Sequence, residues 1–264
     1  MELLYYILIL ILILFIFLYV IIKQKKRNRE LEKLLVHTNE KLERLQISFG
    51  RFTPEEVIEH LTDSDSAFKP SMRSVTVLFA DIKGFTKMCG EMEPSVVLGI
   101  LNGYFRCMNK VLTKHHGQVT ELIGDGILSL FGALSNNPWQ VQDAVMAALE
   151  MRKVLDEYNK KLKAKSFPEL SFGIGIHKGP VLAGVIGNYE LSKFGVVGDP
   201  INVAARVEAL TRDHNVDILI TDKIMAELDN RFILEKMPPT MVKGKSEPIE
   251  TYFVKGLTKK INSF

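Results

Sequence analysis

The chain has 264 residues, and 47% of them are apolar, which suffices for one packed domain with an additional segment. Five of its positive charges gather between residues 23 and 29, and without them the net charge of +3 becomes −2, so the body of the protein is not a basic nucleic-acid binder. Cys89 and Cys107 are too few for a disulfide framework or a cysteine metal site.

An uninterrupted run of apolar and aromatic residues extends from Leu3 to Ile22. In a helix that rises about 1.5 Å per residue, this run is about 30 Å long, the thickness of a bilayer core, so the sequence predicts a transmembrane helix within residues 1–22. The alternative is a cleaved signal peptide, which would start with basic residues, whereas here Glu2 precedes the run and the basic cluster follows it. That cluster predicts a single-pass protein of the plasma membrane with everything downstream in the cytoplasm.

Residues 23–53 are predicted to form a basic juxtamembrane segment and a coiled coil. Apolar side chains recur there in alternating steps of four and three, which favours a parallel two-stranded coiled coil and therefore a dimer. The alternative is a single amphipathic helix lying on its own domain. Pro54 is expected to open a linker helix within residues 54–70. The heptad positions are Leu31, Leu35, Thr38, Leu42, Leu45, Phe49 and Phe52.

From Ser74 onward, apolar patterns alternate between the periods of strands and helices. The order strand, helix, strand, strand, helix, strand predicts an α+β domain over residues 71–257, with the ferredoxin-like split βαβ antiparallel sheet and its helices on one face. A strand at 194–197, a helix at 200–211 and shorter elements follow, and residues 258–264 form a tail. The first elements are Ser74–Ala80, Pro94–His115, Gln118–Ile123, Ile127–Phe131, Trp139–Leu162, and strands near Leu170–His177 and Val181–Ile186.

Two aspartates stand at positions where strands end. Asp81 follows a predicted buried strand, and Asp125 lies in a Gly-Asp-Gly turn between two strands. Such residues can meet across neighbouring strands and form the all-oxygen site that hard divalent cations such as Mg²⁺ require. Together with Asn202 and Arg206 further on, they suggest phosphoryl chemistry on a nucleotide. Either aspartate alone could equally cap a strand or a turn.

Five motifs resemble, in order, the signatures of the class III adenylate/guanylate cyclase catalytic domain. The similarity extends from Ser71 to Val254, which is most of the chain. Any one motif would be weak, but five in the same order make a chance resemblance very unlikely. The motifs are Phe79–Thr86 (FADIKGFT), Ile123–Asp125 (IGD), Gly173–Gly179 (GIGIHKG), Gly198–Arg206 (GDPINVAAR) and Val242–Lys245 (VKGK).

The resemblance implies a reaction in which the 3′ oxygen of a nucleoside triphosphate attacks its own α-phosphate, releasing pyrophosphate and a cyclic nucleotide for intracellular signalling. Two Mg²⁺ or Mn²⁺ ions would be bridged by Asp81 and Asp125, with the backbone carbonyl of Ile82 as a further ligand. Backbone N–H groups of Gly84, Phe85 and Thr86 would cradle phosphate oxygens, although the same segment can be read as a simple strand-to-helix turn.

Further roles follow from the same resemblance. Asn202 and Arg206 are four residues apart and share a helix face, where Asn202 would position the ribose and Arg206 would stabilise charge on the α-phosphate. Lys243 would bind the terminal phosphates, with Lys245 as the less favoured candidate. Pro180 departs from the family, since some members carry an arginine near the phosphates at this place.

The purine is expected to be read by Glu121 and Gly195. A carboxylate at position 121 can accept both N1–H and the exocyclic amine of guanine, but it repels N1 of adenine. Gly195 lacks the side-chain acceptor that adenylate-specific members present to the adenine amine. The sequence therefore favours GTP, with ATP as the alternative substrate; Glu121 could also merely end a strand at the surface.

In class III cyclases the metal aspartates and the Asn–Arg pair come from different subunits. This chain carries both sets, so the resemblance predicts a homodimer with two equivalent sites. An alternative of another class is an inactive, cyclase-like nucleotide-binding or scaffold module. The histidines His115, His116 and His177 have no metal-ligand spacing and are interpreted as structural.

Overall fold

The computed structural model describes residues 2–49, 70–187, 192–241 and 248–258, with the side chains of residues 2–13, 15–16, 44–49 and 192–193 left out. The chain divides into two compact units, residues 1–59 and residues 60–264, which are described separately. The expected linker helix at Pro54 lies outside the described residues, as does the tail beyond residue 258.

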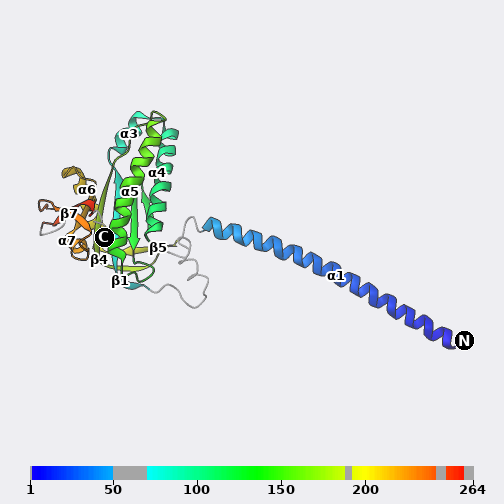
Figure 1. The fold of residues 1–264 in the computed structure, drawn as a ribbon. Coiled ribbons are helices and arrows are strands. Elements are labelled where there is room, and N and C mark those ends of the chain that lie inside the picture. The colour runs from blue at the N-terminus through cyan, green and yellow to red at the C-terminus, as the bar shows by residue number, and fades with distance from the viewer. Residues whose placement is uncertain (1, 50–69, 188–191, 242–247, 259–264) are drawn as a thin grey trace, which may run out of the picture. The chain divides into compact units, whose positions relative to one another are not determined.

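The described part of the first unit is one long helix, α1 (Glu2–Phe49), drawn in blue in Figure 1. Its expected coiled-coil positions Leu31, Leu35 and Leu42 are more than half exposed, as they would be in one strand of a coiled coil. Pairing of two such helices stays a prediction. Within the side chains that the structure describes, no helix is long and apolar enough to cross a membrane. Most side chains of the transmembrane helix expected at residues 3–22 lie outside that set, so this helix stays a prediction.

The second unit is built on the predicted split βαβ arrangement. Its sheet begins in the order β2-β3-β1-β4, all antiparallel, which confirms the expected core of the fold. The two connecting helices, α4 and α5, pack against each other and lie side by side in Figure 1. These elements are β1 (Ser71–Ile82), α4 (Pro94–Lys114), β2 (Gln118–Ile123), β3 (Gly126–Phe131), α5 (Gln140–Lys163) and β4 (Phe172–Gly187).

The second half of the chain extends this sheet and makes it mixed. β6 pairs parallel to β4, because the crossover between them contains the helix α6. β8 and β7 then continue the sheet in antiparallel fashion, and β5 pairs with the distal half of β4. The elements are β5 (Ser192–Val197), α6 (Asp199–Asp213), β6 (Ile218–Thr221), β7 (Phe232–Lys236) and β8 (Thr251–Leu257), with the short helices α3 (Phe85–Glu91) and α7 (Asp222–Met225).

The two strands expected near 170–177 and 181–186 are one continuous strand, β4, so that prediction was wrong. Gly179-Pro180 suggested a turn, but β1 pairs with β4 from Phe172 to Ala183 without interruption. Along the opposite edge of β4, pairing with β6 ends at Ile176 and pairing with β5 starts at Leu182. Pro180 lies in this gap, where its missing N–H removes no hydrogen bond from that edge.

The helices cover both faces of the sheet, which corrects the expectation of helices on one face. Leu78, Ala80, Ile174 and Ile176 belong to the core formed with α4 and α5. Successive strand residues point to opposite faces, so Gly175 points away from that core, and a Cβ added to it would lie 2.2 Å from the backbone nitrogen of Glu208 in α6. α6 therefore packs on the other face, in contact with β4 and β1.

Candidate active site

The structure brings the two predicted metal aspartates together. Asp81 is the second-last residue of β1, and Asp125 lies in the turn between β2 and β3. The strands β1 and β3 are neighbours, with Ala80 paired to Ile127. Burial, followed by the negative charge of Asp81, raises the pKa of Asp125. Two acidic groups thus converge at one place.

This pair fits a hard divalent cation. Neighbouring carboxylates repel each other when both are charged, and a cation between them removes that repulsion. Among the described residues, no group of three or more His, Cys, Asp or Glu side chains gathers. An ion held by Asp81 and Asp125 would therefore complete its shell with backbone, water or substrate oxygens, as Mg²⁺ commonly does. The carbonyl of Ile82 stays a predicted ligand.

A cationic side chain that the sequence analysis did not identify contacts Asp81. Arg212, in the last turn of α6, donates from Nη2 to Asp81 Oδ2 at 2.6 Å and from Nη1 to Glu208 at 3.3 Å. Glu208 is 4% exposed, and burial raises its pKa to about 7, with the charge of Arg212 opposing this shift and that of Asp81 adding to it. The Glu208–Arg212 spacing of four on a helix was visible in the sequence, whereas Asp81 lies 131 residues from Arg212.

A lysine fixes the end of β1 to the end of α6. Lys83 donates from Nζ to the carbonyl oxygens of Thr211 at 3.3 Å and Val216 at 2.7 Å. Burial lowers the pKa of Lys83, which the charge of Asp217 partly offsets. Because carbonyl groups at a helix C-terminus lack partners within the helix, this lysine supplies hydrogen bonds that α6 cannot supply itself.

Asn202 and Arg206 lie elsewhere on α6. Asn202 is exposed and Arg206 half-buried, and Nη1 of Arg206 is buried with no hydrogen-bond partner among the described residues. A helix rises about 1.5 Å and turns about 100° per residue, so Arg206 is about 9 Å along the axis from Arg212 and on a different face. One chain therefore places Asn202 and Arg206 apart from Asp81 and Asp125.

The predicted phosphate cradle lies between β1 and α3. Gly84 precedes α3 and adopts the left-handed conformation with φ of 75°, which favours glycine. Thr86 is exposed, and Phe85 packs against the main core, so its side chain anchors the turn. Phosphate binding by the backbone of Gly84, Phe85 and Thr86 stays a prediction.

The residues expected to select the base lie on two strands. Glu121 is in β2, opposite Leu128 of β3 and next to a register shift. Gly195 is buried in β5 opposite Gly184, and a Cβ at position 195 would lie 2.9 Å from Cδ1 of Ile186, so little room exists for a larger residue. Lys243 and Lys245 lie outside the described residues. Base selection stays a prediction.

The histidines have structural partners. The ring of His177 is 7% exposed and its Nδ1 is 3.0 Å from the Thr221 hydroxyl oxygen. His115 contacts Glu150 at 2.8 Å. His177 also borders a hollow of about 700 Å³ between β4, the start of α6 and the segments around Pro239 and Glu250, which contains none of the predicted site residues.

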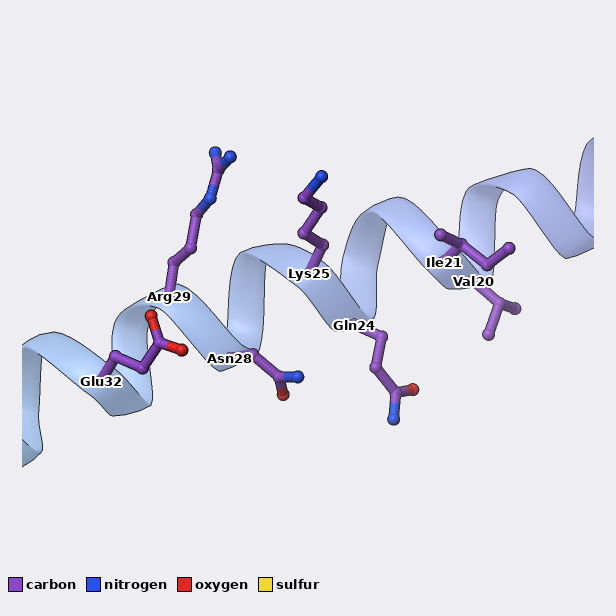
Figure 2. Close-up of a pocket in the computed structure, with 7 residues that line it drawn as sticks. All are labelled: Val20, Ile21, Gln24, Lys25, Asn28, Arg29 and Glu32. Atoms are coloured by element: carbon purple, nitrogen blue, oxygen red, sulfur yellow. The ribbon is translucent and has the colours of Figure 1, made fainter.

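A second hollow follows the surface of α1, as Figure 2 shows. All the residues that line it belong to this one helix, and Lys25 and Arg29 project away from the ribbon (Figure 2). Because no other described element faces it, the hollow cannot enclose a ligand, and we do not consider it a binding site. The lining residues are Val20, Ile21, Gln24, Lys25, Asn28, Arg29 and Glu32.

Comparison with known proteins identifies relatives of the second unit. Residues 68–256 match the family described as "Adenylate and Guanylate cyclase catalytic domain". The chain is 34% identical over 237 residues to an adenylate cyclase of Anabaena cylindrica, covering 86% of this chain and 46% of the relative. It is 27% identical over 227 residues to guanylate cyclase 32E of Drosophila melanogaster, covering 86% of this chain and 19% of the relative. The chain thus spans less than half the length of these relatives.

Two solved structures are similar to the second unit. The guanylyl cyclase Cya2 superposes with a TM-score of 0.66 at 32% identity, covering 73% of this chain and 97% of that structure. The adenylyl cyclase CyaB from P. aeruginosa gives a TM-score of 0.68 at 25% identity, covering 73% and 98%. Proteins named for either nucleotide therefore share this fold.

Proposed function

The chain belongs to the adenylate and guanylate cyclase catalytic domain family, and we propose that it is a phosphorus–oxygen lyase that converts GTP to the 3′,5′-cyclic nucleotide and pyrophosphate. The match to residues 68–256 covers most of the chain and supports a cyclase domain. The single observation that carries the proposed chemistry is that Asp81, near the end of β1, and Asp125, in the turn that leads into the neighbouring β3, lie beside each other, so that the charge of Asp81 raises the pKa of Asp125. Both lie where a triphosphate and its cations would need oxygen ligands.

In this proposal Asp81 and Asp125 hold two Mg²⁺ or Mn²⁺ ions, with the Ile82 carbonyl as a further ligand. Such ions, when bound, make the ribose 3′-hydroxyl more acidic and neutralise phosphate charge. The aspartates themselves position the 3′ oxygen against the α-phosphate. The turn from Gly84 to Thr86 donates backbone N–H groups to the phosphates, and Lys243 contributes a cation at their far end.

Arg206 carries the stabilisation of charge that develops on the α-phosphate, while Asn202 orients the ribose. The buried Nη1 of Arg206 lacks a hydrogen-bond partner among the described residues, which supports a role in binding an anion that this chain does not itself provide. Because a single chain separates Arg206 from Asp81, we propose a homodimer in which α6 of one copy faces the aspartates of the other.

A mixing experiment tests the shared site. Asp81→Asn and Arg206→Ala chains should each be inactive alone. Half of the dimers in an equal mixture are mixed and have one intact site of two, so the mixture should regain about one quarter of the parental activity. The matched control mixes Asp81→Asn with Asp125→Asn, whose lesions fall on the same half of the site, and should regain nothing. Equal recovery in both mixtures, or in neither, contradicts a site shared in this way.

The preference for GTP rests on Glu121 and Gly195. ATP is the second candidate, and the named adenylate cyclase among the relatives favours it. We expect the full chain, assayed with Mn²⁺ and either nucleotide at equal concentration, to form cyclic GMP preferentially. The Glu121→Lys variant should lose GTP turnover by at least tenfold, because an ammonium group cannot accept the two guanine donors. Preferential cyclic AMP formation by the parental chain would reject the base assignment.

We also propose that residues 3–22 attach the chain to the plasma membrane and that residues 31–52 pair as a coiled coil, with the cyclase domain in the cytoplasm. The apolar run and the basic cluster after it support the anchor, and the heptad positions support the coiled coil. The full chain should stay with membranes after alkaline carbonate washing, and a chain starting at residue 24 should not. Release of the full chain by carbonate contradicts the anchor.

A further inference from the structure

Among the described residues, a positive side chain engages one carboxylate oxygen of Asp81 and leaves the other without one. Its Oδ2 accepts the hydrogen bond from Arg212 Nη2 at 2.6 Å, while its Oδ1 faces the start of β3, 3.5 Å from where a Cβ of Gly126 would lie. The second oxygen is therefore on the side of the turn that carries Asp125. A divalent ion that requires both oxygens of Asp81 meets a guanidinium group already bound to one of them.

We propose that Arg212 competes with metal ions for Asp81 and that Glu208 is the acceptor to which its guanidinium group moves when an ion binds. This inference rests on the proposed function, because it assumes that Asp81 is a metal ligand. A positive charge in contact with a metal-binding oxygen repels a dication and occupies its position. Arg212 thus sets how much free metal the site needs, without touching the nucleotide.

Glu208 is suited to receive the arginine. Nη1 of Arg212 lies 3.2 Å from Glu208 Oε1, yet this buried oxygen makes no hydrogen bond with any described residue. The two residues are four apart on α6 and share one helix face. A small rotation of the Arg212 side chain would thus replace its hydrogen bond to Asp81 with a second hydrogen bond to Glu208, so that the buried carboxylate keeps its countercharge.

The side chain of Glu208 is packed closely against β4, whereas that of Arg212 can turn. A Cβ at Gly173, which is paired with Asp81 across the sheet, would lie 2.4 Å from Glu208 Oε1 and 2.2 Å from Thr211 Oγ1. The side chains of Glu208 and Thr211 therefore occupy the space that a side chain at position 173 would need. The side chain of Arg212, in contrast, is 42% exposed and has room to turn.

Manganese binding to the full chain in the absence of nucleotide tests the proposal, with free Mn²⁺ measured by electron paramagnetic resonance. The Arg212→Gln variant should bind Mn²⁺ about tenfold more tightly than the parent. This factor is the lower end of what losing a charge-assisted hydrogen bond is expected to change, because the side chain of Arg212 is half exposed. The Arg212→Lys variant keeps the charge and should stay within about threefold of the parent. Unchanged or weaker binding by Arg212→Gln overturns the proposal.

The role of Glu208 is tested by a double-mutant cycle. The Glu208→Gln variant leaves Arg212 without its alternative carboxylate and should weaken Mn²⁺ binding about fivefold. In the Arg212→Gln background the same change should have no effect, because no guanidinium group needs an acceptor. Equal effects of Glu208→Gln in both backgrounds contradict the transfer of Arg212 to Glu208.

Two controls separate this inference from simpler explanations. Arg231→Gln breaks a 2.7 Å ion pair with Asp229 elsewhere and should leave Mn²⁺ binding unchanged. If Arg212 only stabilised the end of α6, its replacement by glutamine would lower the unfolding temperature without tightening metal binding. Asp81→Asn should abolish binding in every background. If the Asp81→Asn variant still binds Mn²⁺, the proposed metal site itself is refuted. If Asp81→Asn abolishes Mn²⁺ binding but Arg212→Gln does not tighten it, only the competition by Arg212 is refuted.

Discussion

Replacing Gly175 by alanine should disturb the cyclase domain more than a single methyl group suggests. The new Cβ would lie 2.2 Å from the backbone nitrogen of Glu208 and 2.3 Å from the carbonyl oxygen of Ala204. Both atoms belong to the backbone of α6, so no side chain can turn aside to make room. An ordinary contact needs 3.4 Å, and the helix must therefore move away from β4 by about 1.2 Å.

The expected cost follows from this displacement. Overpacking of a tight interior commonly destabilises a protein by about 1–3 kcal/mol, and a clash with rigid backbone belongs at the upper end. For a domain of this size, 3 kcal/mol corresponds to a fall of about 6–12 °C in the unfolding temperature. A shift of about 1 Å in the helix that carries Asn202 and Arg206 should also lower turnover about a hundredfold.

Scanning calorimetry and a cyclase assay on the full chain measure the two effects. Gly256→Ala is the matched control, because it also places a methyl group on a strand glycine, in β8, but no atom lies within 4 Å of the new Cβ. This control should keep its stability within about 0.5 kcal/mol. If the Gly175→Ala variant had the same unfolding temperature and the same turnover as the parent, the inference that α6 is held against β4 by backbone contact would be wrong.

Three further changes probe the same region. Burial raises the pKa of Glu208 to about 7, above its ordinary 4.5, so between these pH values the folded chain binds a proton that the unfolded chain releases. The free energy of unfolding should therefore fall as the pH rises from about 5 to 8. In urea unfolding of the Glu208→Gln variant, this fall should be smaller by about 2 kcal/mol. Lys83→Met removes the donor to Thr211 and Val216 and should cost about 1–2 kcal/mol in the same assay, with no loss contradicting the capping role. Gly84→Ala forces alanine to a φ of 75° and should cost about 1 kcal/mol, whereas an unchanged urea midpoint would argue against strain at this turn.

Local patterns in the sequence predicted much of the sheet. The Gly-Asp-Gly turn between two apolar runs gave the β2–β3 hairpin, and from it the meeting of Asp125 with Asp81. Apolar spacing located α4 and α5 to within one or two residues. These features depend on residues close together in the chain, which is the range over which turn chemistry and periodicity act.

The remaining features depend on contacts between distant segments. Gly179-Pro180 is a turn signal in any short window, and only the uninterrupted pairing with β1 shows that the strand continues. Likewise, the position of α6 on the opposite face follows from the close approach of its backbone to Gly175. The ion pair of Arg212 with Asp81 depends on that placement, so it could not be predicted from the four-residue spacing of Glu208 and Arg212.

The distal half of β4, together with β5, leaves several aliphatic side chains in water. Leu182, Val185, Ile186 and Val197 are each 38% to 59% exposed in the single chain. Adsorption to vessel walls should therefore remove a large share of a dilute preparation, and association through these side chains should increase with concentration. Rates measured at one concentration should not be transferred to another, and a dilution series belongs with every comparison of variants.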